Sequence, residues 1–138
     1  MSTLNVGTIK SLGSSAPVFQ NSSGVEKGQL AKAWVNFNGN GTLTSSDQSG
    51  VNSSFNITSV IDNGTGLYTI NINNDLSNRN YVVVATVEVS GNSNNTSETV
   101  NMRDPASRTT GSFQLRTGNT ENNTLKDLDR VNAVVFGD

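Results

Sequence analysis

The sequence predicts an all-β protein built as an antiparallel sandwich, and three observations predict this class. The chain has 138 residues, which fits one domain of ordinary size. Asn, Ser, Thr and Gly account for 67 residues, whereas Leu, Ile, Val and Phe account for 34, so the core is lean but sufficient for folding. Apolar residues alternate with polar ones in short runs bounded by turn-forming residues, which is the pattern of half-buried strands.

Residues 1–33 are predicted to form an extended N-terminal arm, and residues 34–138 are predicted to form the sandwich domain. The first segment has too few apolar side chains for a core of its own, so it needs a surface to lie on. Two interpretations stay open: a flexible leader, or an arm that anchors the chain on another subunit or on a copy of itself. The candidate anchoring residues are Leu4, Val6, Ile9, Val18 and Phe19.

The first predicted strand of the domain covers residues 33–37. Its alternate residues Ala33, Val35 and Phe37 share one face, and Trp34 lies on the other. The following Asn38-Gly-Asn-Gly41 consists of residues typical of a turn, because they tolerate backbone conformations that other residues avoid.

The clearest predicted hairpin lies in the middle of the chain. Residues 51–61 place apolar side chains at even spacing and are interpreted as one half-buried strand. Asp62-Asn-Gly-Thr-Gly66 follows as a turn, and residues 68–72 alternate again. Two alternating runs joined by such a turn predict a β-hairpin.

Three more segments and the C-terminal residues also have strand patterns. Residues 81–89 form the most apolar stretch, which predicts a central strand that is covered on both faces at its beginning. Residues 98–102 predict a short strand that ends at Asp104-Pro105, because proline cannot donate to a sheet. Residues 112–116 and 130–136 complete the set.

The segment from residue 125 to residue 130 is the only plausible helix, since Leu125 and Leu128 have helical spacing. The remaining pattern, six or seven short strands joined by turns, predicts an antiparallel β-sandwich, jelly-roll-like or of a related kind.

Composition excludes several function classes. The chain has no His and no Cys, which excludes a Ser-His-Asp triad, His-bound metals, disulfides and thiolate chemistry. We therefore expect no enzyme, no catalytic residue, no cofactor and no metal site. The net charge is −2 with the basic residues scattered, so we expect no nucleic-acid partner. No apolar run approaches the length of a membrane span, so we expect no membrane partner.

The large aromatic residues are candidates for the core or for a subunit interface; they are Trp34, Phe37, Tyr68 and Tyr81. An alternative for Trp34 is a stacking platform for a sugar. A glycosidase would also need a facing pair of carboxylates, and no pair here has a motif to recommend it.

Other charged residues are expected to serve local contacts. Asp127 and Asp129 have the wrong surroundings for a calcium loop, and Lys126 and Arg130 beside them predict solvated charge or a local ion pair. Three arginines in the C-terminal third can meet carboxylates across a subunit contact or lie on an ordinary polar surface; they are Arg103, Arg108 and Arg116.

Five segments in this order resemble small tail-fibre-like virion proteins of bacteriophages, of the marine cyanophage type. The segments are Ser2–Ile9, Val18–Gly24, Ala33–Gly39, Phe55–Ile70 and Val135–Asp138. The resemblance implies a β-rich structural protein of a phage particle, trimeric, with an extended N-terminal arm and no catalytic motif.

The sequence leads to three expectations about function, of which the first two rest on this resemblance. The first is a short tail-fibre-like projection on the virion surface, in contact with other tail or capsid proteins and with a host receptor such as a cell-surface glycan. Loops at residues 38–50, 90–97 and 117–124 would make the receptor contact. The second is a decoration (cement) protein on the phage head, and the third is a carbohydrate-binding module.

Overall fold

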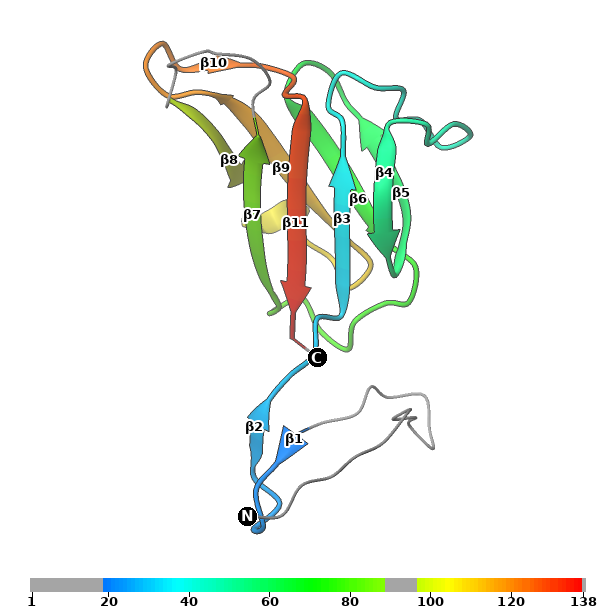
Figure 1. Cartoon of the computed structure of the whole chain (residues 1–138), viewed down its shortest axis with the longest axis vertical. Coiled ribbons are helices and arrows are strands. Elements are labelled where there is room, and N and C mark those ends of the chain that lie inside the picture. Colours follow the sequence, from blue (N-terminus) through cyan, green and yellow to red (C-terminus); the bar gives the residue numbers. More distant parts are fainter. Residues whose placement is uncertain (1–18, 89–96, 138) are drawn as a thin grey trace. The chain divides into compact units, whose positions relative to one another are not determined.

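The computed structural model describes residues 19–88 and 97–137 (Figure 1). The chain divides into two units, Met1–Leu30 and Ala31–Asp138. In the first unit, β1 (Phe19–Gln20) pairs with β2 (Glu26–Gly28) in a small antiparallel hairpin. The predicted anchors Leu4, Val6, Ile9 and Val18 lie outside the described residues, whereas Phe19 begins β1 and is exposed. The anchoring role stays a prediction.

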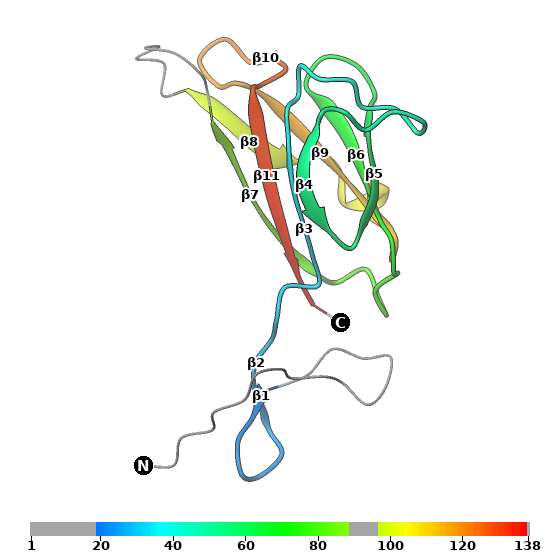
Figure 2. The ribbon, with the colours of Figure 1, turned by 45° about the vertical axis from the view of Figure 1, so that its right-hand side comes forward.

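The second unit is a sandwich of two antiparallel sheets, which confirms the predicted all-β class. The first sheet contains, in spatial order, β4 (Val51–Phe55), β3 (Ala33–Phe37), β11 (Arg130–Phe136) and β7 (Val82–Glu88). The second contains β5 (Ile57–Asp62), β6 (Leu67–Ile72) and β9 (Ser112–Asn119), and both β8 (Glu98–Met102) and β10 (Thr124–Leu125) pair with β9. Figures 1 and 2 show the first sheet in front of the second.

The core is the single layer of side chains between the sheets. Strand alternation sends every second residue inward, and these residues come from both sheets. The rings of Phe37 and Tyr68 meet edge to face at 5.0 Å, and those of Tyr81 and Phe113 at 6.2 Å. The buried apolar residues of the strands are Ala33, Val35, Phe37, Val60, Tyr68, Ile70, Ile72, Phe113, Leu115, Val131, Ala133 and Val135.

The predicted strand over residues 51–61 is wrong in one respect, since it is two strands in different sheets. Asn56 lies between β4 and β5 with a positive φ of 56°, and the chain turns the corner there. The Asn56 side chain donates to the Lys32 carbonyl at 2.9 Å and accepts from the Asn74 backbone N–H at 2.9 Å. The predicted hairpin across Asp62–Gly66 is confirmed, because β5 pairs with β6 there.

Residues 81–89 do not form a central strand covered on both faces. Instead, within the part of the chain that the structure describes, β7 is an edge strand of the first sheet and pairs with β11 alone. The side chains of Val82 and Val84 are 60% and 53% exposed. The apolar run reflects an outward-facing surface rather than a second buried face.

The helix predicted over residues 125–130 is also wrong. Leu125 ends the short strand β10 and is exposed, whereas Leu128 lies in the following connection and is buried in the core. Within the described residues the one helix is the 3₁₀ turn η1 (Pro105–Ser107). The Asp104 carboxylate caps it by accepting from the Ala106 N–H at 2.8 Å, so the predicted end of β8 at Asp104-Pro105 is confirmed.

A partly buried pair of hydrogen bonds joins the second sheet to two connections of the chain. The Tyr68 hydroxyl donates to Asp127 Oδ1 at 2.7 Å, and the Gly66 N–H donates to the same oxygen at 2.6 Å. Gly39 is required here, because a Cβ at that position would overlap the Tyr68 hydroxyl. Asp127 is therefore a structural acceptor, whereas the sequence predicted solvated charge or a local ion pair.

We predict that Tyr68→Phe lowers the free energy of unfolding by about 1–3 kcal/mol, because the Asp127 carboxylate loses a buried donor. Urea denaturation measures the change. In an Asp127→Ala background the same substitution should cost much less, since the two side chains form one interaction. Equal costs in both backgrounds would contradict the assignment.

We also predict that the folded chain loses stability at alkaline pH. The two tyrosines of the chain, Tyr68 and Tyr81, ionise as this happens. Burial raises the pKa of Tyr81 to about 12, although the Arg108 charge opposes the shift. Burial first and the bond to Asp127 second raise the pKa of Tyr68 as well. Because the folded state favours the neutral phenols, their contribution to stability is full below pH about 10 and falls at higher pH; that of Tyr81 is lost as the pH rises through about 12.

Tyrosinate absorbance, recorded beside circular dichroism during a pH titration, measures this loss. Phenol ionisation should accompany unfolding above pH about 10. A tyrosine that ionises at its ordinary pKa in the folded chain would sink the prediction.

Candidate interaction surface

The side chains of the first sheet that do not pack in the core lie on its outward face. Alternation along β3 buries Ala33, Val35 and Phe37 and turns Trp34 outward, as predicted. Trp34 is 36% exposed. It is therefore not a core residue, and its other two predicted roles, at a subunit interface or as a stacking platform for a sugar, stay open.

Six apolar side chains gather on this face. The strand register sets Phe55 opposite Trp34, Trp34 opposite Val134, and Val134 opposite Val84, in one row across all four strands. Phe136 and Val82 face each other two residues further along. We call this group the apolar patch; its members are Trp34, Phe55, Val82, Val84, Val134 and Phe136.

Beside the apolar patch lies a row of amides and hydroxyls. Asn52 Nδ2 donates to Asn36 Oδ1 at 2.7 Å, Asn36 Nδ2 donates to Asn132 Oδ1, and Asn132 Nδ2 donates to Thr86 Oγ1 at 3.3 Å. These bonds satisfy polar groups across the four strands of the sheet. The row is uncharged.

The far end of the face holds one ion pair. Arg130 and Glu88 lie opposite each other on β11 and β7, with 3.0 Å between guanidinium and carboxylate. Both side chains are more than half exposed, so the pair adds little stability. Its two charges neutralise each other, which leaves the face with no net charge.

A contiguous apolar group of this kind differs from the scattered exposed residues of ordinary surfaces. A single exposed Leu or Val needs no explanation, whereas a cluster with two or more aromatic rings is typical of an interaction site. Two features of the sequence point to this face: the Val82-Val-Val84 run and, in a distant part of the chain, Trp34. Only the strand register shows that these residues share one face.

The other predicted core or interface aromatics lie in the core. Phe37, Tyr68 and Tyr81 are each almost fully buried. The Tyr81 hydroxyl donates to the Ser112 carbonyl at 2.8 Å. Arg108 lies over the Tyr81 ring, 5.1 Å from its centre, and donates to the Tyr81 carbonyl at 2.8 Å.

Several of the charged residues that the sequence singled out make contacts within the chain. Lys126 pairs with Glu98 at 2.8 Å, not with an adjacent aspartate. Arg103 donates to Gln114 at 3.1 Å, and Asn40 donates to Asp129 at 3.2 Å. Within the described ranges, no group of three or more acidic side chains could hold a metal ion, and no helix has the length and hydrophobicity to cross a membrane.

Among the described strand residues of this sheet, the one acidic residue on the Trp34 face is Glu88, at the far end of β7. Its carboxylate pairs with Arg130. One carboxylate in an ion pair does not make the facing pair of acids that sugar hydrolysis requires. The arrangement suits packing against another protein surface.

Comparison of the chain with protein-family models, with curated proteins and with solved structures gives no match.

Proposed function

We propose that this chain is a non-enzymatic structural protein on the surface of a bacteriophage particle and that it assembles with copies of itself through the apolar patch. The observation that carries the assembly part is the row Phe55, Trp34, Val134 and Val84 across an open sheet face. The virion part rests on the resemblance of five segments to small tail-fibre-like proteins.

Covering the apolar patch would stabilise a domain whose core is lean. Burial of apolar surface contributes roughly 25 cal/mol per Å². An isolated domain is stable by only a small difference between burial and chain entropy, so a shared interface has a large relative effect. An assembly would also shield the exposed edge strands β4 and β7, which otherwise can pair with other chains.

A second copy of this chain is the occupant that the chemistry of the face favours. The face carries no net charge, because Arg130 and Glu88 neutralise each other within the chain. The amide row has both donors and acceptors, so an identical row can satisfy it. A partner of strong opposite charge would find nothing here to pair with.

We propose three copies in the assembly, as the resemblance implies, with residues 1–33 as the anchor on the particle. In this arrangement the sheet faces lie toward the shared axis and the loops are turned outward. A short tail-fibre-like projection that contacts a host receptor is the leading role. Decoration of the head is the alternative, and a carbohydrate-binding module ranks third.

We predict that the full-length chain has the mass of three copies in solution and that Val84→Lys has the mass of one, 14.6 kDa. Val84 is more than half exposed, so the lysine enters the apolar patch without disturbing the core. Light scattering after size exclusion measures the mass. The matched control is Leu125→Lys, an exposed apolar residue on the other sheet, which should keep the trimer.

A monomeric wild-type chain would refute self-assembly. If the Val84→Lys variant keeps the mass of the wild-type assembly, the interface does not lie on the apolar patch. If the wild-type chain is a dimer, the apolar patch stays the proposed interface and the three-fold arrangement is rejected.

We predict that purified particles of the phage contain this chain in a small multiple of the tail symmetry. Labelled-peptide mass spectrometry, with the major shell protein as the internal standard, measures the copy number. A ratio that approaches that of the shell protein would favour head decoration instead. Absence from the particle would exclude both structural roles and favour a carbohydrate-binding module.

A further inference from the structure

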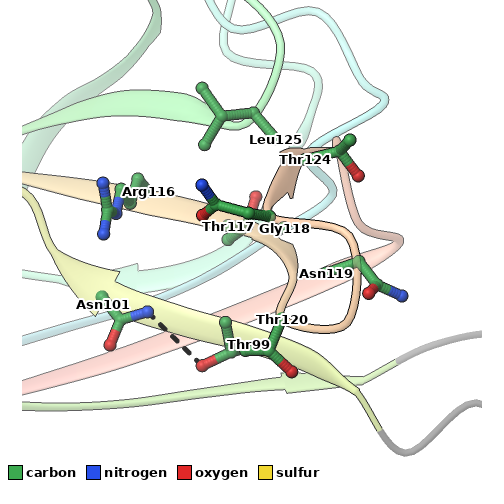
Figure 3. A pocket seen from close by; sticks show the side chains of 10 residues that line it. Thr99, Asn101, Arg116, Thr117, Gly118, Asn119, Thr120, Thr124 and Leu125 are labelled. Carbon is green, nitrogen blue, oxygen red and sulfur yellow. Dashed lines mark hydrogen bonds between the residues drawn. The ribbon is translucent and has the colours of Figure 1, made fainter.

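The outward face of the second sheet contains a hollow of about 240 Å³ beside the C-terminal half of β9 (Figure 3). At this point β9 has β8 as one neighbour and β10 as another. The register places Asn101 opposite Arg116 and Thr99 opposite Gly118. Gly118 lets β10 lie close, because a Cβ there would overlap the Thr124 carbonyl oxygen. The hollow is therefore built by paired strands, which give it a defined shape.

Arg116 supplies the only charge in the lining of the hollow. Its side chain is exposed, and among the described residues its guanidinium has no hydrogen-bond or ion-pair partner. The nearby cation Lys126 differs, since it pairs with the Glu98 carboxylate at 2.8 Å. None of the described residues that line the hollow is acidic, so the guanidinium is free to bind an anion.

The rest of the lining suits a sugar ring better than a bare ion. Thr99, Asn101 and Asn123 bring hydroxyl and amide groups, which donate to and accept from sugar hydroxyls. Leu125 is 43% exposed and offers an apolar surface to the C–H groups of a ring. The volume is below the roughly 300–1,000 Å³ of pockets for drug-sized ligands, which suits a single sugar unit.

We propose that this hollow binds one carboxylate-bearing sugar unit, with the carboxylate held by the Arg116 guanidinium and the ring hydroxyls held by the polar side chains of β8 and the β9–β10 connection. A guanidinium can hold a carboxylate with two parallel hydrogen bonds, which gives the contact direction as well as strength. The site deepens the receptor-contacting part of the proposed function and rests on it. It uses no residue of the apolar patch.

The test is an NMR titration of the isotope-labelled full chain with sugar acids and their neutral counterparts. The probes are glucuronic acid, galacturonic acid and N-acetylneuraminic acid, compared with glucose and galactose. We expect at least one acid to shift the backbone amides of residues 99–101 and 116–125 in a saturable manner, and the neutral sugars to shift them far less.

Variants at two arginines provide the controls. Arg116→Gln should weaken binding of the acid about tenfold or more, because a charge-assisted contact is lost, while its spectrum shows an intact fold. Arg103→Gln should bind like the wild-type chain, since Arg103 contacts Gln114 and does not line the hollow. Arg116→Lys should fall between them, because it keeps the charge and loses the paired geometry.

Three results would overturn the inference. The first is no response to any of the acids, and the second is an unchanged affinity in Arg116→Gln. The third is an equal response to inorganic phosphate, which would reduce the hollow to a general anion site. Each of these results leaves the oligomeric mass and the copy number on the particle untouched, so the two proposals fail separately.

Discussion

The hydrogen bond between the Tyr68 hydroxyl and the Asp127 carboxylate is the constraint on which the arrangement of the two sheets depends. Tyr68 belongs to the second sheet, and Asp127 lies in the connection that leads into β11 of the first sheet. The Leu128 carbonyl accepts from the Gly39 N–H at 2.8 Å, which attaches the end of β3 to the same point. The Tyr68 hydroxyl is part of a buried side chain and loses stability without its partner, so the bond favours one packing of the sheets.

The single core layer explains why the two outward faces can differ so much in chemistry. Stability depends on the inward positions of each strand, where substitutions leave cavities or buried polar groups. Outward positions carry no such requirement, and a sandwich folds with polar residues there. The apolar patch is therefore not needed for the fold of one chain. An exposed group of rings and valines is a liability for a free monomer, which supports the proposed assembly through this face.

Local patterns were predictable from the sequence, and long-range ones were not. Alternation in residues 33–37 places Trp34 outward, and the turn at Asp62–Gly66 joins a hairpin, because both depend on neighbours in the chain. The corner at Asn56 was missed because the alternation continues across it. The positive φ of Asn56 and the bonds from its side chain to residues distant in sequence, such as Lys32, define the corner. The edge position of β7 depends in the same way on which strands lie beside it.

The hollow around Arg116 was even less predictable from the sequence, because its lining comes from three strands and one connection that no motif links. Arg116 itself resembled Arg103 and Arg108 in the sequence, and only the structure separates them. Arg103 has an amide partner and Arg108 lies on an aromatic ring, whereas Arg116 has neither. Because the Arg116 guanidinium makes no contact with the described residues that would stabilise the fold, it is available for a ligand. Because the apolar patch lies on the opposite sheet, assembly through one face would leave the Arg116 hollow open on the other.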